Sequence, residues 1–183
     1  MRRLILAAAL CATPATAALA PGAKAPDFAT RGAIAGKVFN VHLAQQLKKG
    51  PVVLYFFPAA NTKGCNAEAQ AFAAAVPDFK KAGAQVIGMS ADTVETLTAF
   101  SAKECAGMFP VASAGPKVIA GYDVGLGRKI AVNGGPEREV TNRTSYVIAP
   151  DGRILFVHSE MSPNAHVANT LAAVKDWRAK HPK

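Results

Sequence analysis

Cys65 stands where a buried strand would end and a helix would begin. It lies in the segment FPAANTKGCNAEAQ (57–70), whose first residue is the last residue of the apolar run PVVLYFF (51–57). The first turn of a helix presents unpaired N–H groups and the positive end of the helix dipole, so a thiol there should ionise more readily than a free cysteine. Thr62 is suited to begin the helix and to offer its hydroxyl to the backbone or the thiolate, and Gly64 allows close approach to the sulfur. These residues predict a nucleophilic thiolate.

The same cysteine also fits a purely structural place in the core. Apolar side chains recur at spacings of four and three residues and predict one buried helix face, which comprises Cys65, Ala69, Phe72, Val76 and Phe79. Cysteine is often a small buried side chain on such a face. On the residue types alone, both interpretations of Cys65 stay open.

A spaced pattern favours the reactive interpretation. Pro58, Thr62 and Cys65 form P-x-x-x-T-x-x-C directly after an apolar strand. This pattern resembles the active-site motif of the peroxiredoxins, and VVLYFFPAANTKGC looks most like their bacterioferritin-comigratory, or Q-type, branch. The resemblance covers most of the chain after its first residues and includes GAKAPDF (22–28), GMSAD (88–92) and TSYVIAPDGRI (144–154). It implies a thioredoxin-like fold in which Cys65 is the peroxidatic cysteine, Thr62 its hydrogen-bonding partner and Pro58 a wall of the pocket.

The resemblance also implies roles for two charged residues. The family uses an arginine just before a late strand, where Arg143 stands in NRTSYVI, and Glu68 matches the family three residues after Cys65. A guanidinium near Cys65 would hold the thiolate and bind a peroxide oxygen as charge develops on it. Without the resemblance, Arg143 is equally a solvated residue at a strand edge, and Glu68 is an exposed helix residue.

The implied reaction needs no metal, flavin or haem, and we expect no cofactor. The Cys65 thiolate would attack one peroxide oxygen and become a sulfenic acid. No ligand-like spacing joins the cysteines to any of the four histidines, His42, His158, His166 and His181. A copper site in HSEMSPNAH (158–166) is the weaker alternative, because Met161 and His166 are more simply surface residues.

The sulfenic acid needs a second thiol to resolve it. Many Q-type relatives carry that cysteine five residues after the first, where this chain has Gln70. Other Q-type relatives keep the resolving cysteine in the helix after the second strand. Cys105 lies in the helix expected there, and this resemblance makes it the candidate resolving cysteine. A disulfide with Cys65 would require the two Cα atoms to come within about 6 Å, and we expect local unwinding. The alternative is that Cys105 packs in the core on a helix face with Leu97 and Ser101.

Two other functions on the same fold compete with a peroxidase. A thioredoxin-like disulfide oxidoreductase would resemble C-x-x-C at the start of the helix, whereas here Thr62 takes the first position. A non-catalytic binding protein, such as a copper-delivery protein, would carry paired cysteines a few residues apart, which Cys65 lacks. We therefore expect a thiol-dependent peroxidase that reduces hydrogen peroxide or organic hydroperoxides and is recycled by a thioredoxin-like or other thiol reductant.

Strands and helices alternate along the chain and predict a single α/β domain with a mixed central sheet flanked by helices. Short apolar runs predict strands at 51–57 and 84–90, and Pro-Asp-Gly between two apolar runs predicts a hairpin over 145–159. Three helix boundaries are expected: a kink or end at Pro77, a cap at Asp92 and a start at Ser162–Pro163.

The first residues predict a cleaved secretory signal over 1–17, with its boundary between residues 17 and 20, followed by one domain over 18–183. Two arginines precede an apolar run that ends in small residues. The run is interrupted too early for a transmembrane anchor, and the leucine before Cys11 argues against lipid attachment there. We expect export to an oxidising compartment, the bacterial periplasm, with Cys65 and Cys105 as the remaining cysteines.

The chain is basic without having a basic face. Its formal net charge of +9 falls by two when Arg2 and Arg3 leave, and the other cations are scattered, as in Lys48–Lys49 and Lys80–Lys81. Because no basic stripe interleaves with aromatic residues, we expect no nucleic-acid partner. The other apolar stretches are too short to span a membrane. By resemblance to Q-type relatives, we expect a monomer.

Overall fold

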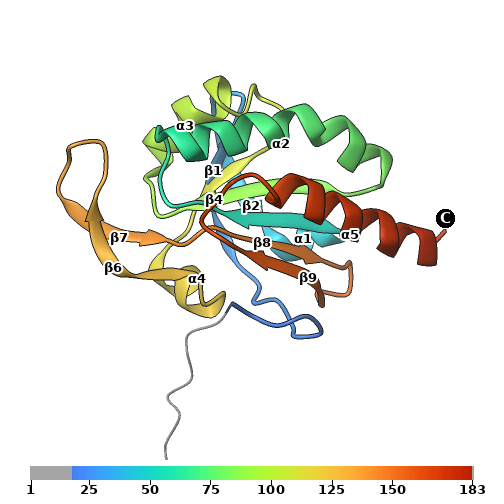
Figure 1. The fold of residues 1–183 in the computed structure, drawn as a ribbon. Coiled ribbons are helices and arrows are strands. Elements are labelled where there is room, and N and C mark those ends of the chain that lie inside the picture. Colours follow the sequence, from blue (N-terminus) through green and yellow to red (C-terminus); the bar gives the residue numbers. More distant parts are fainter. Residues whose placement is uncertain (1–17, 183) are drawn as a thin grey trace, which may run out of the picture.

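A mixed seven-stranded sheet with the strand order β2-β1-β5-β4-β3-β8-β9 lies beside a two-stranded ribbon of β6 and β7 (Figure 1). The structure, a computed structural model, describes residues 18–182, and the predicted signal over 1–17 lies outside the described residues. The strands are β1 (Ala29–Ile34), β2 (Lys37–His42), β3 (Val52–Phe56), β4 (Gln85–Ser90), β5 (Val111–Ser113), β6 (Gly125–Ala131), β7 (Glu137–Thr141), β8 (Thr144–Ile148) and β9 (Ile154–Ser159). The helices are α1 (Leu43–Leu47), α2 (Lys63–Lys81), α3 (Val94–Lys103), α4 (Pro116–Gly121) and α5 (His166–Lys180).

β3 is an interior strand of the sheet and comes from the apolar run at 51–57. It pairs in parallel with β4 and antiparallel with β8, and all five of its residues are buried. Because side chains alternate along a strand, Tyr55 faces one core layer while Leu54 and Phe56 face the other. The predicted α/β class with a mixed central sheet is confirmed.

The helices that carry the candidate site lie together on one face of the sheet. α2, α3 and α5 cover this face, and α2 and α5 contact each other (Figure 1). On the other face, Leu43 and Leu47 of α1 pack with Tyr122, which directly follows α4. None of the helices described between residues 18 and 182 is long and apolar enough to cross a membrane.

α2 buries the helix face that its apolar spacing predicts, with Cys65 at one end of that face and Phe79 at the other. Of the two outcomes expected at Pro77, an end to the helix is wrong, because α2 continues to Lys81. Proline removes one N–H donor from the helix, yet the chain stays helical, and Phe79 two residues later is fully buried.

Thr93 caps α3 at the position predicted for Asp92. The Thr93 hydroxyl accepts a hydrogen bond from the Thr96 N–H at 3.3 Å. The Asp92 carboxylate instead accepts from the Ala60 N–H and the Ser90 hydroxyl, both at 2.7 Å. The cap prediction for Asp92 is therefore wrong, because this side chain holds the loop that precedes α2.

α5 begins at His166, which corrects the predicted start at Ser162–Pro163. The segment before α5 is engaged in tertiary contacts. The Met161 carbonyl accepts a hydrogen bond from Arg143, and the Glu160 carbonyl faces the His166 ring. These contacts anchor residues 160 and 161 to the core, and the helix starts five residues later.

Candidate active site

Arg143 lies against Cys65. The Nη2 atom of Arg143 is 3.5 Å from the Sγ atom of Cys65, and only 4% and 2% of these residues are exposed. The register of the sheet explains this contact: β8 runs antiparallel to β3 with Thr144 opposite Phe56. Arg143 therefore lies where β3 ends and the chain turns toward α2. The alternative of a solvated arginine at a strand edge is wrong.

Three acceptors surround the guanidinium of Arg143. Its Nε donates to the Met161 carbonyl at 2.9 Å, and its Nη1 donates to the Glu68 carboxylate. The alternative of an exposed Glu68 is wrong, because this residue is buried. Gly64 lies beside the guanidinium, and a Cβ atom there would touch Nη2 at 3.4 Å. The fold thus places a fixed cation at the Cys65 sulfur before any substrate arrives.

Cys65 lies in the first turn of α2, as predicted, where unpaired N–H groups and the helix dipole favour an anion. Thr62 is the N-cap residue, but its hydroxyl donates to the Ala59 carbonyl at 2.9 Å rather than capping the helix or reaching Cys65. Pro58 is buried at the start of the same loop. Pro58 and Thr62 therefore shape the loop that leads to Cys65.

Burial and the neighbouring Arg143 shift the pKa of Glu68 in opposite directions. Burial raises the pKa of Glu68 from 4.5 to about 7, and Arg143 opposes this increase without cancelling it. The Oε1 atom of Glu68 has no hydrogen-bond partner among the described residues, and it lies 3.8 Å from Nδ1 of His166. Glu68 therefore holds a proton at a pH where an ordinary carboxyl has lost it.

His166 completes this buried cluster, and the expectation of a surface residue was wrong. Its Nε2 lies 2.9 Å from the Glu160 carbonyl, its Nδ1 lies 2.8 Å from the Ser145 hydroxyl, and burial lowers its pKa to about 4. The weaker copper-site interpretation thereby loses an accessible ligand. The available signal was the spacing of four residues along α5 that joins His166 to Thr170 and Val174, all of which are buried.

Cys105 lies just beyond the end of α3. The prediction that it lies within this helix is wrong. α3 ends at Lys103, and the Cys105 thiol is free and fully buried. Burial, with a smaller effect from Glu104, raises the pKa of Cys105 to about 12. The Gln70 amide donates to the Glu104 carboxylate at 2.8 Å and ties this segment to α2. Cys105 is therefore a protonated, enclosed thiol in this arrangement.

Tyr55 is a further residue near both cysteines that the sequence reasoning missed. Its hydroxyl is buried without a hydrogen-bond partner among the described residues. Its pKa is raised well above the ordinary value by burial first, and then by Cys105, Glu68 and Cys65. No sequence pattern distinguished Tyr55 from its neighbours in the apolar strand.

The β6–β7 ribbon braces the loop that leads to Cys65. Asn133 donates to the Ala60 carbonyl at 3.3 Å, and Arg138 pairs with Asp92. Between the ribbon and this loop lies a cavity of about 320 Å³, lined in part by Asn61 and by these residues. The ribbon and Asp92 thus hold the loop that leads to Cys65 in place.

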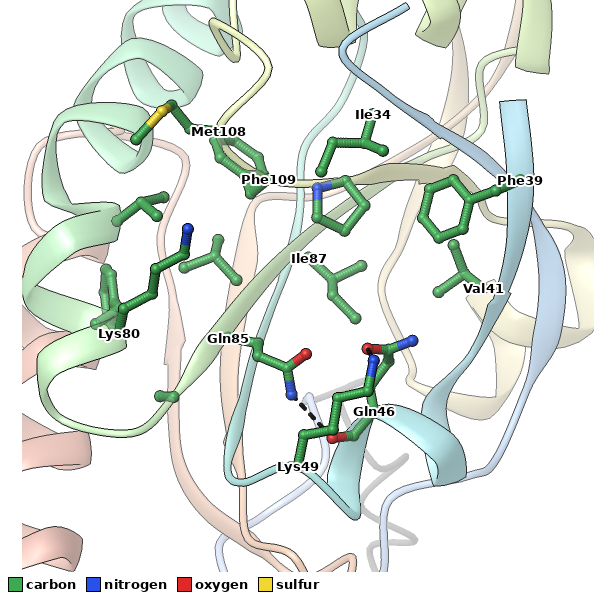
Figure 2. A pocket seen from close by; sticks show the side chains of 15 residues that line it. Ile34, Phe39, Val41, Gln46, Lys49, Lys80, Gln85, Ile87, Met108 and Phe109 are labelled. Carbon is green, nitrogen blue, oxygen red and sulfur yellow. Dashed lines mark hydrogen bonds between the residues drawn. The ribbon is translucent and has the colours of Figure 1, made fainter. Parts of the chain in front are cut away.

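An apolar groove of about 300 Å³ lies elsewhere, between β1, β2, β4 and the C-terminal half of α2 (Figure 2). Its lining includes Ile34, Phe39, Ile87 and Phe109. None of the six predicted site residues lines this groove, so it is not part of the Cys65 site.

Residues 21–157 match the AhpC/TSA family. The chain belongs to that family. Chloroplastic peroxiredoxin Q of Sedum lineare is 33% identical to this peroxiredoxin, and the match covers 73% of this chain and 68% of the relative. The crystal structure of the peroxidoxin BcpB from Mycobacterium tuberculosis matches with a TM-score of 0.72 and 32% identity, and the match covers 85% of this chain and 96% of BcpB.

A structure of the bacterioferritin comigratory protein of Xanthomonas campestris, described for its alkyl peroxide reduction activity, is also similar. Its TM-score is 0.67 at 27% identity, and the match covers 81% of this chain and 91% of that protein. A peroxiredoxin Q of the same organism has been solved as two single cysteine-to-serine variants. The predicted thioredoxin-like fold, Q-type branch and enzyme class, a thiol-dependent peroxidase, are confirmed.

The raised pKa of Glu68 predicts a pH-dependent stability difference. A carboxyl group whose folded pKa lies above its unfolded pKa stabilises the fold below the unfolded value, and this contribution is lost as the pH rises through about 7. Glu68→Gln has no such loss, so it should gain about 1–3 kcal/mol in unfolding free energy relative to wild type between pH 5 and pH 8. Urea denaturation at both pH values measures this gain. The same change at exposed Glu137 is the control, and an equally small gain in both variants would contradict the prediction.

Proposed function

We propose that this peroxiredoxin reduces hydrogen peroxide and organic hydroperoxides with Cys65 as its peroxidatic cysteine. The observation that carries the proposal is the 3.5 Å approach of Arg143 Nη2 to Cys65 Sγ in the first turn of α2. The guanidinium and the helix dipole both favour a thiolate at this position. Organic hydroperoxides are included because the similar Xanthomonas protein is described for alkyl peroxide reduction.

In the proposed step, the Cys65 sulfur forms a bond to one peroxide oxygen while the O–O bond breaks. The other oxygen leaves as hydroxide or alkoxide and takes a proton from water. The sulfur is oxidised by two electrons to a sulfenic acid, and the peroxide is reduced to water or an alcohol. Arg143 stabilises the charge that develops on the oxygens, Glu68 holds Arg143, and Pro58 and Thr62 form the wall and the loop of the pocket.

We further propose that Cys105 resolves the sulfenic acid. Its sulfur bonds to the Cys65 sulfur, the S–O bond breaks, and water leaves. Both cysteines belong to the same buried cluster. Because Cys105 is buried with a raised pKa, its segment must open first and break the bond between Gln70 and Glu104. A thioredoxin-like dithiol then reduces the disulfide.

The proposed place of action is the bacterial periplasm, where the protein works as a monomer. The pattern of residues 1–17 supports export. Ala18 and Leu19 pack against the core layer that contains Leu54 and Phe56, so a chain that begins at Ala18 retains these contacts.

Replacing Cys65 by serine should abolish peroxide consumption, because a hydroxyl does not supply the nucleophile. Arg143→Ala should lower the rate roughly 100-fold, because it removes the cation that stabilises the reacting sulfur and oxygens. Consumption of hydrogen peroxide with dithiothreitol as reductant measures both. Arg128→Ala, at an exposed position, is the control and should keep the wild-type rate. Near-normal turnover in either site variant would remove that residue from the mechanism.

One equivalent of peroxide should convert the two thiols into an intramolecular disulfide between Cys65 and Cys105. Disulfide mapping by mass spectrometry before and after oxidation measures this directly, because trypsin leaves the cysteines on separate peptides, 64–80 and 104–117. Stable Cys65 sulfenic acid beside a free Cys105 thiol would show a one-cysteine cycle with an external thiol instead.

Expression of the full chain in a Gram-negative bacterium should yield a periplasmic protein that begins between residues 18 and 21. The intact mass of the protein released by osmotic shock checks both the compartment and the cleavage site. Recovery of the uncleaved chain in the cytosolic fraction alone would contradict export.

A further inference from the structure

Two buried acidic groups face one buried cation in this site. Arg143 pairs with Glu68 through Nη1, and its Nη2 lies 3.5 Å from the Cys65 sulfur. Over residues 18–182, Arg143 is the one lysine or arginine that is buried. If Glu68 and Cys65 were both ionised, two negative charges would share one positive charge in a region closed to water, which is costly. The Glu68 carboxylate and the Cys65 thiolate therefore compete for Arg143.

His166 is placed to decide this competition. Its Nε2 faces the Glu160 carbonyl, which can only accept, so this nitrogen carries a proton. The nitrogen that can gain or lose a proton is then Nδ1, which lies 2.8 Å from the Ser145 hydroxyl and 3.8 Å from Oε1 of Glu68. Oε1 is the buried oxygen without a hydrogen-bond partner among the described residues. At 3.8 Å, Oε1 and Nδ1 are too far apart for a hydrogen bond but close enough for their charges to interact, so a proton on either group changes the affinity of the other for a proton.

We propose that His166 is a positioning residue of the Cys65 site that shares one buried proton with Glu68. While the pair holds this proton it has no net charge, and the charge of Arg143 is left for the Cys65 thiolate. When the proton is lost, the Glu68 carboxylate takes up Arg143, and the thiolate is disfavoured. The inference rests on the proposed function, in which Cys65 is the reacting thiol, and adds a pH-dependent control of that thiol.

The surroundings of the pair support a shared proton. Burial raises the pKa of Glu68 to about 7 and lowers that of His166 to about 4, so both groups favour their neutral forms. Arg143 lowers both pKa values, and His158, whose ring lies 4.5 Å from the His166 ring, lowers that of His166 further. The titratable or charged groups that face the pair are Cys65, Tyr55, Arg143 and His158.

The test compares the rates at which iodoacetamide alkylates Cys65 in the reduced full chain between pH 5 and pH 9, measured on the tryptic peptide 64–80. In wild type, the rise of the rate with pH should flatten near neutrality, where Glu68 loses its proton. Glu68→Gln should remove this flattening, because glutamine does not ionise. His166→Gln should move the flattening to lower pH and reduce the rate at pH 7 about threefold to tenfold, because an amide donor stabilises the carboxylate.

Two comparisons distinguish a positioning role of His166 from a purely structural contribution of its side chain to packing. His181→Gln makes the same change at the exposed end of α5 and should follow the wild-type profile. In the Glu68→Gln background, His166→Gln should have no further effect. An equal loss of rate at every pH and in both backgrounds would overturn the inference, and so would a wild-type profile for His166→Gln.

The wild-type protein decides the question if His166→Gln does not fold. NMR with labelled glutamate and histidine should find one proton on the pair at pH 6, on either Glu68 or Nδ1 of His166. An ionised Glu68 beside a neutral His166 at that pH would contradict the inference. Alkylation consumes no peroxide, so an absence of peroxide turnover would count against the proposed function and leave this result intact.

Discussion

Arg143 is a fixed cation in the core, and the site is built from the groups that neutralise it there. A buried guanidinium is costly unless charged and hydrogen-bonding partners surround it. Glu68 and the Met161 carbonyl satisfy two of its nitrogens and leave Nη2 for the Cys65 sulfur. The antiparallel pairing of β8 with β3 and the adjacent start of α2 bring these partners together. A thiolate is the charge that completes this arrangement.

The two buried cysteines differ in their surroundings, and we therefore expect them to differ in reactivity. Cys65 lies beside a cation and a helix N-terminus, whereas Cys105 has only the adjacent Glu104 and a pKa raised to about 12. The proposed cycle therefore divides into a peroxide step carried out by the closed fold and a disulfide step that needs the segment after α3 to open. Gln70, where the resemblance to the Q-type branch would place the nearest resolving cysteine, instead donates a hydrogen bond to Glu104, and this bond opposes that opening.

Much of the fold could be predicted from the sequence because apolar spacing records which face of each element is buried. The buried strand β3, the buried face of α2 and the late hairpin follow that rule. The starts of α3 and α5 could not be predicted from local signals, because Asp92 and the segment before His166 are engaged in contacts with residues far away in the chain. Resemblance to a family indicated Cys65 and Arg143, but the burial of Glu68 and His166 depends on how α2 and α5 pack, which local patterns do not encode.

The central claim is that Cys65, held beside Arg143, is the thiol that peroxide oxidises first. Dimedone present during the addition of one equivalent of hydrogen peroxide traps a sulfenic acid where it forms, and mass spectrometry of the tryptic peptides locates it. We expect the label on peptide 64–80, which contains Cys65, and we expect it to form roughly 100-fold more slowly in Arg143→Ala. A label on peptide 104–117, with Cys65 unmodified, would contradict it.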